Sequence, residues 1–203
     1  MKLVVISPEG EDPRETAVLG ALFAAGLECY HVRKPGWSEE KLRTWLRALP
    51  ADWRPRLVLH EHHDLVSELG LGGRHWRDDG AEWRGVPYPG ITSRSCHDLP
   101  TLRTALGRYA SVFFGPVLPS ISKPGRAPRA DLSFDEVSKL LAARAPLPRR
   151  TAVLALGGVT AEKIPQLHAI GFDGVAVLGA VWQSVDPVAD FDQLQHAIFS
   201  HAA

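Results

Sequence analysis

Short apolar runs alternate with longer amphipathic segments along the chain. The apolar runs predict eight strands, at residues 2–7, 27–33, 56–61, 73–76, 88–93, 111–117, 151–158 and 174–181. The segments between them predict helices at residues 14–25, 38–49, 63–69, 98–107, 131–143, 161–170 and 187–200. Apolar runs without polar alternation are typical of parallel strands that are covered on both faces. The pattern therefore predicts an α/β protein, a (β/α)8 TIM barrel that forms a single domain over residues 1–203.

The fourth unit of this pattern is the weakest. The segment after the strand Gly73–Trp76 is polar from Arg77 to Gly85 and has no helical periodicity, so the fourth helix is predicted to be weak or missing. A doubly wound open sheet is the competing architecture, but no glycine-rich dinucleotide fingerprint follows the first strand. The Pro- and Gly-rich stretch Ser120–Arg129 lies inside the barrel pattern and indicates a long active-site loop.

The last two predicted strands run into glycine, at Gly157-Gly158 and at Gly179. Glycine at a strand end lets backbone N–H groups approach an anion closely, and the next helix turns its positive end toward that anion. Turns of this kind on the final strands are where (β/α)8 barrels build a phosphate site. The sequence therefore predicts a phosphorylated small-molecule ligand.

The balanced charge of the chain argues against nucleic acid and membrane surfaces as partners. Lys plus Arg and Asp plus Glu number 23 each in 203 residues, so no global charge favours nucleic acid or a membrane surface. The two cysteines, Cys29 and Cys96, lack metal-ligand spacing, and no apolar run has the length of a signal peptide or a membrane span. We therefore expect a cytoplasmic protein with a local anion site, and a homodimer as the default assembly.

Polar residues at the predicted strand ends supply the candidate chemistry, because barrels carry their catalytic residues there. Three cationic side chains lie at or after the ends of two predicted strands: Arg33, Lys34 and Lys123. At the same mouth of the barrel they can hold a phosphate and a diphosphate. His75 and Ser93 also stand at such ends, without an assigned role.

Histidines cluster after the third predicted strand. In an extended segment His60 and His62 point the same way, as paired metal ligands do in some barrel hydrolases. The eighth strand ends without an acidic residue to complete such a site, which argues against zinc. The pattern favours Glu61 as a Mg²⁺ ligand, which Asp78 and Asp79 after the fourth strand could complete, and His60 as an acid or base.

Several motifs occur in the order of one known family. In residues 115–125, a strand end with Gly115-Pro116 runs into a loop with the sequence Ser120-Ile121-Ser122-Lys123-Pro124. Further matches lie at residues 69–76, 95–99, 155–160 and 171–177. The chain resembles the thiamine phosphate synthase and thiazole tautomerase (TenI-like) family of (β/α)8 barrels over essentially its whole length.

The resemblance implies a role for each matching residue. Lys123, Ser120 and Ser122 would contact the diphosphate and the thiazole portion, Ser95 would lie on the diphosphate side, and Arg33 would grip the diphosphate. Glu61 and Asp79 would hold Mg²⁺ in place of two family aspartates. Backbone amides would bind the thiazole phosphate at Gly157, Gly158, Leu178 and Gly179.

Departures from the family pattern leave the reaction open. His31 replaces a glutamine that recognises the pyrimidine, Lys34 is displaced by one position, and Pro116 replaces a tautomerase histidine. The first hypothesis is a synthase that couples hydroxymethylpyrimidine diphosphate with a thiazole phosphate. The second is a thiazole tautomerase acting on thiazole carboxylate phosphate, with His31 or His60 as the acid or base. The third is a non-catalytic binder of thiamine intermediates.

Overall fold

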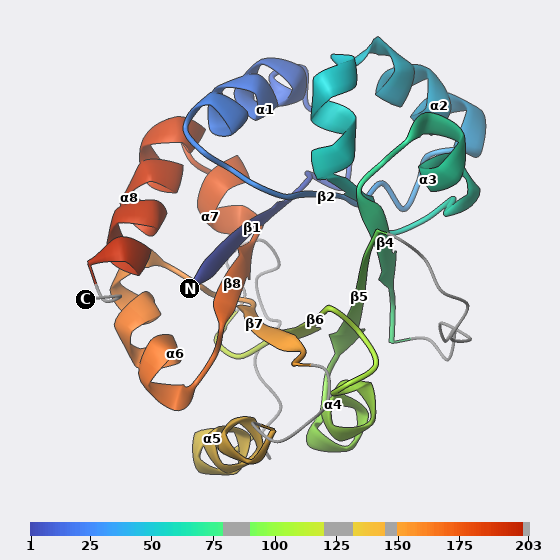
Figure 1. The fold of residues 1–203 in the computed structure, drawn as a ribbon. Helices are drawn as coiled ribbons and strands as arrows, with labels where there is room; N and C mark the ends of the chain where they lie inside the picture. Colours follow the sequence, from blue (N-terminus) through green and yellow to red (C-terminus); the bar gives the residue numbers. More distant parts are fainter. Residues whose placement is uncertain (79–89, 120–131, 145–149, 201–203) are drawn as a thin grey trace.

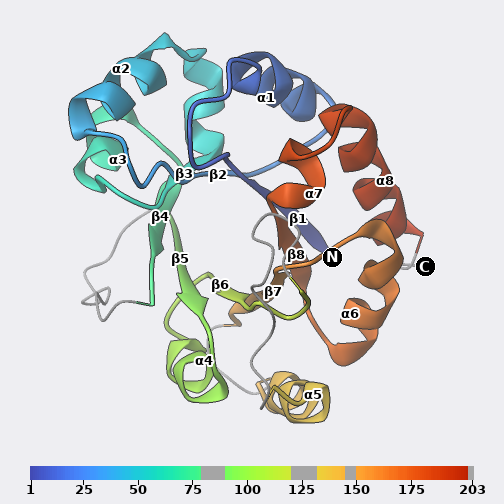
Figure 2. The same cartoon turned by 180° about the vertical axis from the view of Figure 1, so that it is seen from behind.

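Eight parallel strands close into a barrel in chain order, with β8 paired to β1. The computed structural model describes residues 1–78, 90–119, 132–144 and 150–200. Within these residues the helices form a ring around the strands (Figures 1 and 2). The strands are β1 Lys2–Ile6, β2 Tyr30–Val32, β3 Leu57–Leu59, β4 Gly73–Trp76, β5 Ile91–Cys96, β6 Ser111–Phe114, β7 Ala152–Leu156 and β8 Gly174–Val177. The predicted (β/α)8 barrel is confirmed.

The helices follow the predicted positions closely. Polar caps fix several of their first turns: Ser38, Asp98, Ser133 and Asp186 each accept a hydrogen bond from a backbone N–H three residues on. None of the described helices has the length and hydropathy that a membrane span needs. The helical elements are α1 Glu15–Ala24, α2 Glu39–Ala48, η1 Ala51–Arg56, α3 Asp64–Leu69, α4 Leu99–Ala105, α5 Phe134–Ala143, η2 Ala161–Lys163, α6 Ile164–Ile170, α7 Gly179–Trp182 and α8 Pro187–Phe199.

Most predicted strands are shorter in the structure, and two boundaries that differ bear on the site. β5 runs to Cys96, three residues beyond the predicted end, so Ser93 and Ser95 lie within the strand. The predicted eighth strand ends at Val177, and the apolar residues after it form the short helix α7. A short apolar run does not by itself distinguish a strand from a buried helix, which explains the second error. The predicted weak fourth helix and the loop Ser120–Arg129 fall largely or wholly outside the described residues.

The interior of the barrel has two chemically different sides. Val4, Ile6, Phe113, Leu154 and Ala176 form an apolar cluster contributed by β1, β6, β7 and β8. The opposite side, built by β2 to β5, instead buries polar side chains, among them His31, His60, His75 and Ser93. Because buried polar groups are costly unless they are hydrogen-bonded, this half of the interior marks the candidate site.

Candidate active site

Three histidines from neighbouring strands meet inside the barrel. His31 lies in β2, His60 directly follows β3, and His75 lies in β4. One ring nitrogen from each lies within 4.8 Å of the others. His31 Nδ1 is 3.1 Å from His60 Nε2, and the rings of His60 and His75 are stacked with centroids 4.0 Å apart. This group, His31, His60 and His75, is called the histidine cluster below.

Two serines of β5 complete the polar side of the interior. Ser93 Oγ lies 2.8 Å from His75 Nδ1, and Ser95 Oγ lies 2.9 Å from His75 Nε2. The register explains the contact, because Ser93 is the strand partner of His75. Ser95, expected on the diphosphate side, is thus joined to the histidine cluster. The sequence alone assigned no role to His75 or Ser93. Both residues face the interior of the barrel, to which every second side chain of a strand points.

The histidine cluster is uncharged at neutral pH. Burial away from water lowers the pKa of His31 to about 3. Burial, and then the electrostatic influence of neighbours that include Arg33, lowers the pKa values of His60 and His75 well below the usual histidine range. Each imidazole therefore carries one N–H donor and one nitrogen lone pair, and a neutral imidazole of this kind is the form in which histidine binds a metal.

The pairing of His60 with His62 predicted from the sequence is wrong. His62 has a backbone φ of 53°, so the segment is not extended at this point. The His62 ring turns away to the carbonyl of Trp37, with Nε2 3.1 Å from that oxygen. His63 lies with its Nε2 3.0 Å from the carbonyl of His75. His60 alone of these three enters the barrel, and its partners come from β2 and β4.

Arg33 is held at the carboxyl end of β2 by a reciprocal contact with Ser7. The Arg33 N–H donates to Ser7 Oγ at 2.8 Å, and Ser7 Oγ donates to the Arg33 carbonyl at 3.0 Å. The guanidinium forms an ion pair with Glu9 and its side chain keeps 26% of its surface exposed. A cation fixed at a strand end and open to solvent is suited to binding a diphosphate.

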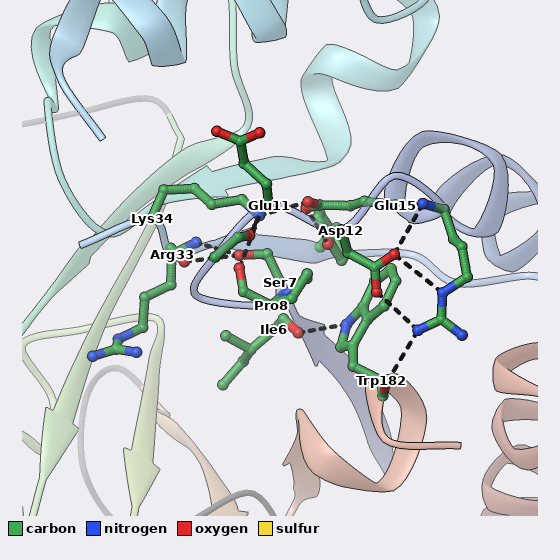
Figure 3. A network of polar contacts seen from close by, with 12 residues as sticks. Ile6, Ser7, Pro8, Glu11, Asp12, Glu15, Arg33, Lys34 and Trp182 are labelled. Carbon is green, nitrogen blue, oxygen red and sulfur yellow. Dashed lines mark hydrogen bonds and ion pairs between the residues drawn. The ribbon is translucent and has the colours of Figure 1, made fainter. Parts of the chain in front are cut away.

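Lys34 occupies a different environment from Arg33, and the two side chains diverge in Figure 3. Its ammonium donates to Glu15 Oε2 at 2.5 Å, to the Pro8 carbonyl at 2.8 Å and to the Gly10 carbonyl at 2.9 Å. The Lys34 side chain is 0% exposed, and Glu15 also accepts a hydrogen bond from the Tyr30 hydroxyl. The structure therefore places Lys34 as a link between β2, α1 and the loop that joins β1 to α1.

Burial acts on both partners of this ion pair. Desolvation raises the pKa of the Glu15 carboxyl and lowers the pKa of the Lys34 ammonium, although each partner opposes the shift of the other. Such a pair adds little net stability over an apolar pair, but loss of one partner leaves an uncompensated buried charge.

The carboxylates after β3 and β4 are paired with arginines. Glu61 forms an ion pair with Arg77 and also accepts a hydrogen bond of 3.4 Å from the Lys34 backbone N–H. Asp78 pairs with Arg94 at 3.0 Å. Glu61 thus lies at the mouth, next to His60 in the chain, with its carboxylate paired to Arg77. Asp79, Ser120, Ser122 and Lys123 lie outside the described residues.

The predicted phosphate turn adopts backbone conformations that favour glycine. Gly157 has φ of 96° and Gly158 has φ of 66°. A Cβ atom on Gly158 would lie 2.3 Å from the Pro119 carbonyl oxygen, so this turn packs directly on the chain after β6. After the next strand, Leu178 immediately precedes α7, which starts at Gly179. The structure therefore ends β7 and β8 in adjacent turns, because the two strands pair with each other.

Comparisons with known proteins agree with this arrangement. A family model described as thiamine monophosphate synthase matches residues 3–181. The chain belongs to the thiamine monophosphate synthase family. A thiamine-phosphate synthase from Chromobacterium violaceum is 30% identical over 197 residues, which cover 92% of this chain and 91% of the relative. One from Bordetella bronchiseptica is 32% identical, with 89% and 87% covered.

Solved structures share the architecture. The crystal structure of a thiamine phosphate pyrophosphorylase from Bacteroides thetaiotaomicron matches with a TM-score of 0.81 and 25% identity, and 99% of each chain is covered. A thiamine phosphate pyrophosphorylase from Pyrococcus furiosus has a TM-score of 0.80 at 16% identity and shows the shared fold. Membership of the thiamine monophosphate synthase family places the protein in thiamine biosynthesis, among the transferases.

Proposed function

We propose that the protein is a thiamine phosphate synthase that joins hydroxymethylpyrimidine diphosphate to a thiazole phosphate. The observation that supports this most strongly is the family match over residues 3–181, combined with Arg33 at the end of β2 and the Gly157-Gly158 turn at the end of β7. These two features lie at the same mouth, because all strands of the barrel are parallel.

The reaction needs charge stabilisation more than a nucleophilic side chain. The bond between the pyrimidine methylene carbon and the diphosphate oxygen breaks, and its electron pair leaves with the diphosphate. The thiazole ring nitrogen then forms the new bond to the methylene carbon. Arg33 and Lys123 would stabilise the negative charge on the leaving diphosphate, with Ser95, Ser120 and Ser122 as further hydrogen-bonding groups. Positioning of the two substrates supplies the rest.

We propose that the thiazole phosphate is bound by backbone N–H groups at Gly157, Gly158, Leu178 and Gly179. Turns with positive φ direct consecutive N–H groups to one side, and the first turn of a helix leaves its N–H groups without partners inside the helix. The adjacency of β7 and β8 would let both turns contact one phosphate.

Mg²⁺ is the cofactor that we propose for the synthase reaction. When bound it would neutralise charge on the diphosphate oxygens. Glu61 and Asp79 would hold it, because carboxylate oxygens are the ligands that this cation prefers. The carboxylate of Glu61 fits such a role in type and position, but Arg77 must release it first.

The deciding experiment is turnover by the purified full chain, with hydroxymethylpyrimidine diphosphate, a thiazole phosphate that carries no ring carboxylate, and Mg²⁺. We expect thiamine phosphate to form, and both EDTA and Lys123→Ala to abolish it. The matched control is Lys163→Ala, because Lys163 is an exposed lysine of η2 outside the proposed site. Absence of thiamine phosphate with the folded protein would overturn the proposal.

A thiazole tautomerase is the second candidate function. The His31–His60 pair, with nitrogens 3.1 Å apart, favours it, because two imidazoles in contact supply a lone pair that can accept a proton and an N–H that can return one. Isomerisation of the thiazole intermediate without coupling, lost in His60→Ala, would support this function. Binding of the phosphates without either reaction would instead indicate a non-catalytic binder.

The location and assembly of the protein also stay predictions. We propose a cytoplasmic enzyme acting on small phosphorylated substrates, which agrees with the two free cysteines of the described chain, Cys29 and Cys96. We propose a homodimer as its assembly, and sedimentation equilibrium of the purified chain measures this directly.

A further inference from the structure

We propose that the histidine cluster binds a borderline divalent transition metal, with Zn²⁺ and Co²⁺ as the representative ions. The three residues converge from three adjacent strands, and one ring nitrogen from each lies within 4.8 Å of the others. This site is separate from the carboxylate pair proposed for Mg²⁺. It also goes beyond the proposed reaction, because its test uses the metal alone.

The donor set determines the class of metal. Three imidazoles with one position left open are a usual ligand set for zinc and similar ions, whereas Mg²⁺ prefers oxygen ligands. Zn–N bonds of about 2.0–2.1 Å hold ligand nitrogens roughly 3.3 Å apart in a tetrahedral site. The 3.1 Å separation of His31 Nδ1 and His60 Nε2 is already close to this value.

The position of His75 shows which movement coordination requires. Its ring is stacked on His60 with an interplanar angle of 19°, so one of the two rings must tilt before both lone pairs meet at one ion. Both of its nitrogens are now within hydrogen-bonding distance of serine hydroxyls. If one serine gives way to the metal, the other remains as the partner that orients the ring, which is a common arrangement around ligating histidines.

The surroundings of the cluster are compatible with a dication. Two arginines, Arg33 and Arg77, place positive charge near His60. Each is paired with a carboxylate: Arg33 with Glu9, and Arg77 with Glu61. These carboxylates offset the positive charge that a bound dication would meet. The Phe113 ring lies 4.6 Å from the His31 ring and 4.7 Å from the His75 ring, between centroids. An apolar wall of this kind limits water around a bound ion and strengthens coordination.

The experiment is a titration of the EDTA-treated, dialysed full chain with Co²⁺. We expect one equivalent to bind, with the visible absorption bands of low-coordinate Co²⁺, and we expect Zn²⁺ to displace it. One of the two variants Ser93→Ala and Ser95→Ala, the one that removes the serine retained on His75, should weaken Co²⁺ binding by roughly 10–100-fold, as loss of an outer partner does. Two ligand variants, His75→Leu and His31→Gln, should each weaken Co²⁺ binding more than loss of the serine does. If His75→Leu fails to fold, His31→Gln still tests the site.

The matched control is His62→Gln, because this histidine is two residues from His60 but points to the Trp37 carbonyl. It should bind Co²⁺ as the unmodified protein does. Failure of the unmodified chain to bind one equivalent would overturn the proposal. Binding that survives both His75→Leu and His31→Gln, or that is lost in His62→Gln, would place the metal elsewhere and overturn it as well. None of these results depends on thiamine phosphate formation.

Discussion

Lys34 and Arg33 are neighbours in the chain, but their side chains serve different purposes. The sequence suggested that both cations bind phosphate, whereas the structure encloses the Lys34 ammonium between Glu15 and two carbonyls. The packing explains the difference, because Glu15 and two carbonyls enclose the Lys34 ammonium, whereas the Arg33 side chain stays partly exposed.

We expect Lys34→Met to lower the free energy of unfolding by about 3 kcal/mol, since it leaves the Glu15 carboxylate buried without a counter-charge. Urea unfolding measures this change. The control is Lys41→Met, which removes a lysine from the exposed ion pair with Glu11 and should have a much smaller effect. Adding Glu15→Gln to Lys34→Met should recover part of the loss, and equal losses in Lys34→Met and Lys41→Met would contradict this role.

Burial of His31 makes stability depend on pH. Its pKa is about 3 in the folded protein, compared with about 6.5 when unfolded, so the unfolded state binds more protons between these values. Stability is therefore complete above pH 6.5 and falls as the pH drops toward 3, by about 1.4 kcal/mol per pH unit for this residue.

We expect His31→Gln to reduce that slope in metal-free protein, measured by urea unfolding at a series of pH values from 7.5 to 4.5 (about one unit apart). The exposed His168 of α6 provides the control substitution, His168→Gln, which should retain the full slope. An unchanged slope in His31→Gln would show that this imidazole is not held neutral by burial.

At the scale of elements, the turn between β7 and η2 depends on its glycines. Gly158→Ala would place a Cβ atom 2.3 Å from the Pro119 carbonyl and 2.6 Å from Leu118 Cβ, so the turn must shift. We expect about a 100-fold loss in kcat/KM for thiamine phosphate formation, because displacement of a binding turn by about 1 Å is enough for this.

Gly171→Ala is the control for Gly158→Ala, because it adds backbone strain without displacing a turn of the proposed site. Gly171 ends α6 with φ of 104°, but its Cβ would meet nothing closer than 3.5 Å. We expect this variant to lose about 1–2 kcal/mol of stability, from the left-handed backbone alone, while kcat/KM is retained. Similar kinetic losses in both variants would show that the β7 turn does not bind the substrate.

At the scale of the whole molecule, the barrel closes where the first and last strands meet. β1 and β8 pair over four residues, and the indole N–H of Trp182 in α7 donates to the Ile6 carbonyl at 2.9 Å. This hydrogen bond joins α7, which follows the last strand, to the first strand, so it stabilises the closed barrel.

We expect Trp182→Phe to lower the free energy of unfolding by about 2 kcal/mol, because it leaves the Ile6 carbonyl without that donor. Trp53→Phe, in the partly exposed η1, is the matched control and should cost less. Far-ultraviolet circular dichroism and the fluorescence of the remaining tryptophans should give one common transition in urea. A separate early transition confined to Trp182→Phe would instead show that the seam unfolds independently.

The sequence by itself determined the eight strands, most of the helices and the glycine turns, because these depend on local periodicity and on backbone conformations that neighbouring residues encode. It also placed Arg33, His31 and His60 at strand ends. Only the tertiary structure decided which of these side chains meet. His31, His60 and His75 are far apart along the chain, and barrel closure and strand register bring them together. The same long-range packing buried Lys34 against Glu15, a partner that no local spacing indicates.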